Sequence, residues 1–160
     1  MKYFSALFLS FFLFSCWNNN QGDPLPHFNA TTLDGKTIST EKLKGKIVVI
    51  KVWATWCGSC LAEMPELNEL IQKYKSDTNV VFLAITDDSK EKVLKLLERI
   101  PSNYQQITDA KDIKLLFQPG PYKEIPKHLV ADKQGNIVFD EAGEIPNIAH
   151  ILSQQIDALK

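Results

Sequence analysis

Hydrophobic residues follow two different patterns along the chain. Continuous apolar and β-branched runs, as expected for strands covered on both faces, occur at residues 46–53 and 80–86. Apolar residues spaced three or four positions apart, the spacing of one helix face, occur at residues 59–74, 89–100, 109–117 and 148–159. Shorter extended segments are predicted at residues 105–108, 127–131 and 136–140. The pattern therefore predicts an α/β protein.

Turn residues refine this order of elements. An Asp-Gly turn inside residues 25–38 predicts an N-terminal β-hairpin, and Asp-Lys-Gln-Gly at 132–135 joins the last two strands in a second hairpin. Pro65 lies inside the first long helix and removes one backbone hydrogen bond, so we expect a kink there. Strand–helix–strand–helix followed by hairpin and helix predicts a parallel pair of strands extended by an antiparallel pair. Several α/β folds have this order.

Two cysteines stand where the first buried strand gives way to a helix. Cys57 and Cys60 belong to the segment WATWCGSC at residues 53–60. A thiol at the start of a helix lies beside unpaired N–H groups and the positive end of the helix dipole, and both favour the reactive thiolate. The second cysteine, one turn later, is close enough to form a disulfide with the first. The segment predicts a reversible redox dithiol.

This segment and its surroundings resemble the TlpA-type (ResA-like) thiol–disulfide oxidoreductases of the thioredoxin superfamily. The resemblance covers roughly residue 23 to the C-terminus. Its landmarks are the CxxC box, AEMPEL at 62–67 with its internal proline, Ile125-Pro126 before a late strand, and the hairpin signal at 132–138. It implies a thioredoxin-like fold: a central mixed sheet flanked by helices, with an N-terminal β-hairpin and an inserted strand–helix. It implies no cofactor beyond the Cys57–Cys60 disulfide.

The resemblance also implies roles for residues around the box. Cys57 would be the exposed nucleophile, and Cys60 would resolve the mixed disulfide by attacking it. Gly58 and Ser59, the dipeptide between them, bring no formal charge to the loop. The direction of electron flow does not follow from this dipeptide.

A late proline and several aromatic residues complete the implied site. Pro126 would form a cis peptide bond with Ile125, whose backbone would pair with a substrate segment. Trp56 is expected at the rim beside the disulfide or in plain packing, and Trp53 in the core. Tyr122 is expected either in the substrate groove or as an ordinary surface aromatic.

Lys51 departs from the family pattern, because thioredoxin has a buried acid at this place. A buried ammonium costs several kcal/mol unless it is solvated or paired. Lys51 is therefore expected either to reach the sheet end or to pair with an acid such as Glu63 or Glu66, structurally or in support of a thiolate. Glu63 is a weak candidate to replace the missing acid. His128, which shares a strand face with Pro126, is expected to be a satisfied or surface imidazole rather than a catalytic one.

The N-terminal segment has the pattern of an export signal. An apolar run at 3–14 follows a lysine and is shorter than the roughly 20 residues of a membrane-spanning helix. Leu-Phe-Ser-Cys at 13–16 resembles a bacterial lipobox, so Cys16 is expected to be lipidated; an ordinary cleaved signal with a spare cysteine is the alternative. The expected organisation is a signal peptide at 1–15, a lipidated cysteine and tether at 16–23, and one thioredoxin-like domain at 24–160.

Charge and residue positions argue against nucleic-acid-binding, zinc-binding and peroxiredoxin functions. A net charge of −1 with no charged blocks argues against nucleic-acid binding and against a basic membrane-binding face. A structural zinc site is disfavoured because His27, His128 and His150 are scattered singly. A peroxiredoxin is disfavoured because Ile50 and Ala54 occupy the places of that family's proline and threonine.

Two functions remain for the chain. The first is a monomeric reductase of protein disulfides, lipid-anchored at the periplasmic face of a bacterial membrane and supplied by a membrane electron donor of the thiol-reducing type. The second is a non-catalytic thioredoxin-fold module whose CxxC binds a partner or copper. Cu(I) favours thiolates, but no methionine-rich tract or neighbouring histidine supports this alternative.

Overall fold

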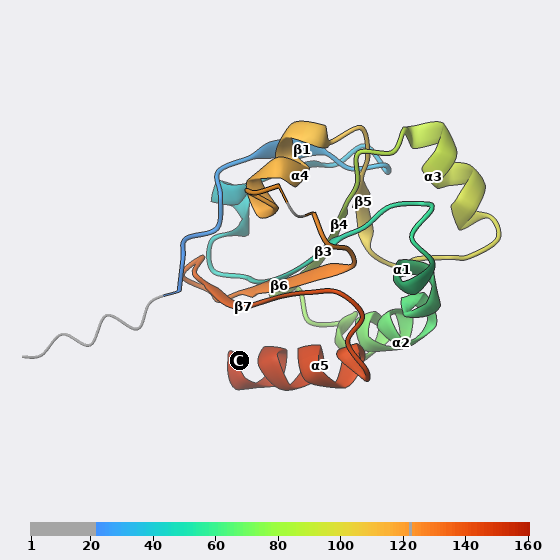
Figure 1. The fold of residues 1–160 in the computed structure, drawn as a ribbon. Helices are drawn as coiled ribbons and strands as arrows, with labels where there is room; N and C mark the ends of the chain where they lie inside the picture. Colours follow the sequence, from blue (N-terminus) through green and yellow to red (C-terminus); the bar gives the residue numbers. More distant parts are fainter. Residues whose placement is uncertain (1–21, 122) are drawn as a thin grey trace, which may run out of the picture.

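The computed structural model describes residues 22–121 and 123–160 (Figure 1). Its elements, in chain order, are β1 (Asn29–Thr31), β2 (Thr37–Ser39), the 3-10 helix η1 (Thr40–Leu43), β3 (Ile47–Val52), α1 (Gly58–Ala62), α2 (Met64–Tyr74), β4 (Val80–Ile85), α3 (Lys90–Leu97), β5 (Gln105–Ile107), α4 (Lys111–Phe117), β6 (Lys127–Ala131), β7 (Ile137–Ala142) and α5 (Ile148–Ala158). Within these residues, no helix has the length and apolar character needed to cross a membrane. The expected export signal, Cys16 and Tyr122 lie outside the described residues.

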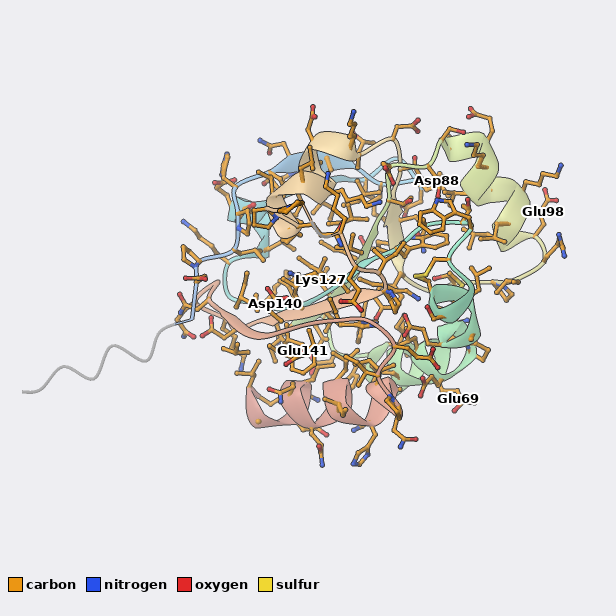
Figure 2. All side chains as sticks on the ribbon, in the orientation of Figure 1. Glu69, Asp88, Glu98, Lys127, Asp140 and Glu141 are labelled. Atoms are coloured by element: carbon orange, nitrogen blue, oxygen red, sulfur yellow. A yellow bond between two sulfur atoms is a disulfide. The ribbon has the colours of Figure 1, made fainter. Side chains whose placement is uncertain are left out.

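A five-stranded mixed sheet forms the centre, in the order β5-β4-β3-β6-β7. β3 pairs in parallel with β4 and antiparallel with β6, and β7 pairs antiparallel with β6. The ion pair between Lys127 Nζ and Asp140 Oδ1, 2.8 Å apart, links these last two strands (Figure 2). The predicted parallel pair with its antiparallel extension is confirmed. The N-terminal hairpin β1–β2 and the inserted β5–α4 are also present.

Two apolar layers cover the sheet. Alternate residues of a strand point to opposite faces, so β3 supplies Ile47 and Val49 to one layer and Val48, Ile50 and Val52 to the other. Side chains of α2, α3 and α5 complete the first layer, and those of η1 and α4 complete the second. All six residues of β3 are buried, which explains the continuous apolar run. Lys51 occupies a position of the first layer.

The first long helix is interrupted rather than kinked. The prediction of one helix over 59–74 corresponds to α1 and α2, which are separated by Glu63 with φ −82° and ψ −8°. Pro65 has no N–H to donate to the carbonyl of Leu61, and it fits without penalty near the start of a new helix. The break therefore follows from Pro65, and it leaves the Glu63 side chain free to turn beneath α1.

Substitution of Leu152 by alanine tests the packing of α5 on the sheet. Leu152 is 0% exposed in the first layer, so Leu152→Ala should lower the free energy of unfolding by about 2–5 kcal/mol in urea denaturation. Leu94→Ala, at a residue that is 44% exposed on α3, is the control and should cost about 1 kcal/mol or less. Equal losses in the two variants would contradict the described packing.

Candidate active site

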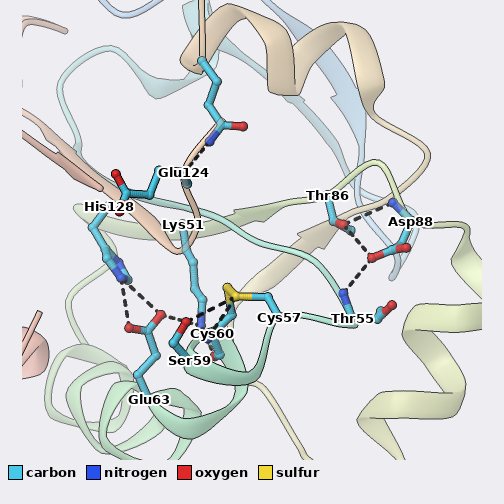
Figure 3. Close-up of a disulfide and its surroundings, with 11 residues drawn as sticks. Lys51, Thr55, Cys57, Ser59, Cys60, Glu63, Thr86, Asp88, Glu124 and His128 are labelled. Carbon is cyan, nitrogen blue, oxygen red and sulfur yellow. Dashed lines mark hydrogen bonds and ion pairs between the residues drawn. A yellow bond between two sulfur atoms is a disulfide. The ribbon is translucent and has the colours of Figure 1, made fainter. Parts of the chain in front are cut away.

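A disulfide between Cys57 and Cys60 lies at the end of the sheet where β3 passes into α1 (Figure 3). Cys57 is the residue that precedes α1, and the backbone N–H of Cys60 donates to its Sγ over 3.2 Å. Ser59 Oγ lies 3.6 Å from the same sulfur. Cys57 is 5% exposed and Cys60 is 0% exposed. Both cysteines are thus buried in the oxidised protein, so the expectation of an exposed Cys57 is wrong; Cys57 retains slightly more exposure than Cys60 because it precedes α1 and Cys60 lies within it.

The loop before Cys57 is fixed from the side of β4. Asp88 Oδ2 accepts a hydrogen bond from the Thr55 backbone N–H at 2.7 Å and lies 3.3 Å from Thr86 Oγ1 (Figure 3). Trp56, the next residue, is 74% exposed at the rim, and Trp53 is fully buried as expected. The sequence analysis did not find Asp88. Its position just after β4, at the same sheet end as the CxxC, was the available signal.

The Ile125–Pro126 peptide bond is cis, as the resemblance implied. Pro126 is buried, and its carbonyl accepts a hydrogen bond from the Gly143 N–H at 2.8 Å. The next residue, Lys127, is the register partner of Val52, the last residue of β3. The proline therefore lies at the sheet end from which the CxxC loop departs.

Lys51, Glu63 and His128 form a buried cluster beneath the disulfide. Lys51 Nζ donates to the Cys60 carbonyl over 2.8 Å and lies 2.9 Å from Glu63 Oε1. His128 Nε2 lies 3.1 Å from Glu63 Oε1 and 3.2 Å from Oε2 (Figure 3). Lys51 and His128 are register partners on β3 and β6. Of the alternatives open for Lys51, pairing with Glu63 is confirmed, and extension along the sheet end into solvent is wrong because Lys51 is 1% exposed.

Burial and pairing act in opposite directions in this cluster. Burial lowers the pKa of Lys51 below its ordinary value, although the Glu63 carboxylate offsets part of this effect. Burial alone would raise the pKa of Glu63, but the hydrogen bond of His128 and the charge and hydrogen bond of Lys51 outweigh it and hold the pKa below its ordinary value. Glu63 is therefore an ionised acceptor shared by two donors.

The prediction for His128 is only partly correct. It expected a satisfied or surface imidazole, whereas the side chain is fully buried and bonded to Glu63 through one nitrogen only. The expectation of a satisfied ring is thus correct for Nε2 and wrong for Nδ1, which has no hydrogen-bond partner among the described residues. No local pattern shows that His128 faces Lys51, because the strand register brings them together.

Among residues 22–121 and 123–160, no three His, Cys, Asp or Glu side chains converge in a way that could hold a metal ion. Ile50 and Ala54 are fully buried apolar residues of the strand and the following loop. The reactive groups gathered at this sheet end are the disulfide and the Lys51–Glu63–His128 cluster.

Comparison with known proteins identifies the family. The chain matches the AhpC/TSA family over residues 21–140. It belongs to this family. Within it, the chain is 34% identical to the thiol–disulfide oxidoreductase ResA of Bacillus cereus over 125 residues, covering 77% of this chain and 70% of that protein. It is 35% identical to the thiol:disulfide interchange protein DsbE of Pseudomonas fluorescens over 129 residues, covering 79% of this chain and 69% of the relative.

A solved structure with a similar fold is also known. A provisionally assigned protein disulfide isomerase from Bacteroides thetaiotaomicron has a TM-score of 0.76 at 28% identity, over 87% of this chain and 89% of that one. The curated relatives are named for thiol–disulfide chemistry, and this AhpC/TSA member carries a disulfide in a CxxC box. The chain is a thiol–disulfide oxidoreductase with a thioredoxin-like fold.

Acidification tests the electrostatics of Glu63. Because its folded pKa lies below the ordinary value of 4.5, the ionised carboxylate stabilises the fold above that pH, and the contribution is lost as pH falls through the folded pKa. Glu63→Gln leaves Lys51 without its counter-charge and should cost about 3–5 kcal/mol of unfolding free energy at pH 7. The difference from wild type should shrink as the pH is lowered below 4.5.

Urea denaturation across this pH range gives the measurement. Glu141→Gln, at an exposed glutamate on β7, is the matched control and should behave like wild type (Figure 2). A Glu63→Gln difference that stays constant from pH 7 into the acid range would contradict a depressed pKa of Glu63.

Proposed function

We propose that this chain is an exported, lipid-anchored oxidoreductase that reduces disulfides in other proteins. The observation that carries the proposal is the asymmetric Cys57–Cys60 disulfide. Its first cysteine lies beside the exposed Trp56, and its second is fully buried. Of the two cysteines, Cys57 at 5% exposed is the one that a partner's sulfur would reach beside Trp56, and Cys60 at 0% is kept for the internal step.

The exchange needs no group other than the two thiols. A thiolate on Cys57 attacks the substrate disulfide, so a Cys57–substrate bond forms and one substrate thiolate leaves. Cys60 then loses its proton and attacks Cys57 Sγ, which re-forms the Cys57–Cys60 bond and expels the second substrate thiolate with the electron pair. The Cys60 N–H at 3.2 Å from Cys57 Sγ favours negative charge on that sulfur.

Residues around the disulfide would orient the substrate. The backbone of Ile125, held by the cis bond to Pro126, is suited to pair with an extended substrate segment as a short β-ladder. Trp56 offers an exposed aromatic surface at the rim, and Gly58 leaves open space where a side chain would project. The Ser59 hydroxyl lies next to the Cys57 sulfur, where it would contact an incoming substrate.

Export and anchoring rest on the N-terminal sequence. The apolar run at 3–14 and the Leu-Phe-Ser-Cys motif ending at Cys16 support cleavage of a signal peptide before a lipidated cysteine. In an exported protein the dithiol would become oxidised without a source of electrons. A membrane donor of the thiol-reducing class would therefore reduce the Cys57–Cys60 disulfide again by thiol–disulfide exchange.

Cysteine substitution tests the catalytic assignment. Cys57→Ser should abolish reduction of insulin disulfides, because the attacking sulfur is lost. Cys60→Ser should trap mixed disulfides through Cys57, which mass spectrometry detects. Cys16→Ser leaves both active-site cysteines in place and should retain the reductase activity, so it serves as the cysteine control. Full activity of Cys57→Ser would contradict Cys57 as the nucleophile, whereas a wild type without insulin-reducing activity would favour a non-catalytic, partner- or copper-binding module.

The direction of electron flow is measured separately. A midpoint potential near that of thioredoxin, about −270 mV, is expected for a reductase, and one near that of DsbA, about −120 mV, would mean an oxidant. Equilibration of the purified protein with glutathione or dithiothreitol buffers gives this potential.

Cell fractionation tests the anchor. When the full-length chain is expressed in a bacterial host, it should partition with membranes and carry acyl chains on Cys16, since stable anchoring requires more than one chain. Cys16→Ala should block this processing. Recovery of the wild type as an unacylated, soluble periplasmic protein would rule out the lipid anchor while leaving the redox assignment untouched.

A further inference from the structure

One nitrogen of His128 is among the six buried side-chain polar atoms of the described residues that have no hydrogen-bond partner, and it lies in the cluster beneath the disulfide. The side chain is 0% exposed, and Nδ1 makes no hydrogen bond to any of the described residues. Buried polar atoms in folded proteins almost always have partners, and leaving one without costs free energy. An orphaned imidazole nitrogen beside a redox site therefore requires an explanation.

The partner of the other nitrogen fixes the form of the ring. An ionised Glu63 can only accept hydrogen bonds, so His128 Nε2, at 3.1 and 3.2 Å from its two oxygens, must carry a hydrogen. In the neutral imidazole, Nδ1 is then a lone pair with nothing bonded to it. His128 is thus a buried base whose accepting nitrogen is open.

Charge balance links this base to the disulfide. With neutral His128, the positive charge of Lys51 and the negative charge of Glu63 cancel, so the oxidised cluster sums to zero. A thiolate on Cys57 would add an uncompensated negative charge to a largely water-free site. A proton on His128 Nδ1 would cancel it, and the resulting imidazolium would already face the Glu63 carboxylate.

We propose that His128 takes up a proton when the Cys57–Cys60 disulfide is reduced and releases it when the disulfide re-forms. A donor dithiol supplies two electrons, which break the sulfur–sulfur bond. One accompanying proton goes to Cys60, and the second goes to His128 while Cys57 stays a thiolate. Oxidation reverses each transfer. His128 is a positioning residue here, because it contacts Glu63 and not the reacting sulfurs.

The contacts of the cluster support this coupling. Lys51 Nζ bridges the Cys60 carbonyl at 2.8 Å and Glu63 Oε1 at 2.9 Å, so three successive contacts join His128 to the backbone of the buried cysteine. Lys51 and His128 also keep Glu63 ionised, and an ionised Glu63 is what stabilises an imidazolium. Lys51 and His128 thus stabilise the negative charge of Glu63, and Glu63 in turn stabilises a positive charge on His128.

The other titratable groups on the elements packed around His128 are exposed, half-buried or neutral, so Lys51 and Glu63 determine the charge balance of the cluster. On β7 its register partner is Glu141, which is exposed to solvent (Figure 2). α5, which packs on β6, carries His150 and Asp157, both at the surface. From α2 the half-buried Glu66 acts on Lys51, and the buried Tyr104 stays neutral because burial and the Glu63 charge both raise its pKa.

A glutamine at position 128 separates proton uptake from hydrogen bonding. His128→Gln keeps an N–H donor for Glu63 but has no nitrogen that titrates. This inference rests on the proposed thiol exchange, but its test uses dithiothreitol as the electron donor and needs no protein substrate. The midpoint potential of the full chain is measured against pH, which gives the number of protons taken up per disulfide reduced.

The expected result is that only His128→Gln loses the proton that accompanies disulfide reduction at His128. Where alkylation rates show Cys57 already to be a thiolate, the wild type should take up about two protons per disulfide reduced and His128→Gln about one. His150→Gln, at an exposed histidine on α5, should match the wild type. Equal proton uptake in wild type and His128→Gln would overturn the proposal.

Nuclear magnetic resonance of the wild type gives a second readout that does not depend on the variant's stability. The imidazole of His128 should titrate at higher pH in the reduced protein than in the oxidised protein. An unchanged titration in the two redox states would also overturn the inference. A wild type that fails to reduce insulin disulfides would refute the proposed function and leave this proton count measurable.

Discussion

The carboxylate of Glu63 makes the contacts that tie the active-site helix to the central sheet. It lies at the break between α1 and α2, forms an ion pair with Lys51 on β3, and faces His128 on β6. Lys51 in turn holds the carbonyl of Cys60. Because removing one partner of a buried ion pair leaves a charge without compensation, the three residues depend on one another more than a surface pair would.

The break that presents Glu63 follows from Pro65. With a helix-compatible residue there, α1 and α2 would continue as one helix, and the residue after Leu61 and Ala62 would keep its helical direction. The interruption instead lets a polar side chain enter the first layer directly beneath the disulfide. On the opposite side, Asp88 fixes the loop before Cys57 through the Thr55 N–H. The disulfide is thus held by polar contacts from both neighbouring strands of β3.

Local sequence was sufficient for much of the fold. The run at 46–53 predicted β3, because a strand covered on both faces needs no polar alternation, and Ile125-Pro126 before a late strand predicted the cis bond through the family resemblance. Pro65 predicted an irregularity at the right place, although its position alone did not distinguish a kink from the complete interruption at Glu63.

The parts that sequence could not predict depend on strand register. The sequence offered both Glu63 and Glu66 as acidic partners for Lys51, and only the folded structure shows that Lys51 pairs with Glu63. His128 faces Lys51 because β6 returns antiparallel to β3 with Lys51 opposite His128. A shift of one residue would turn His128 to the other face, and no pattern within either strand fixes that register.

Alkylation of the reduced protein tests the central claim, that Cys57 is the nucleophile of a dithiol exchanger. The protein is reduced, treated briefly with iodoacetamide at pH 6, and digested so that mass spectrometry measures the label on each cysteine. Cys57 should be labelled well before Cys60, because its sulfur receives the Cys60 N–H and because the residue is 5% exposed whereas Cys60 is 0% exposed. Labelling of Cys60 first, or of both at the same rate, would contradict the assignment of roles.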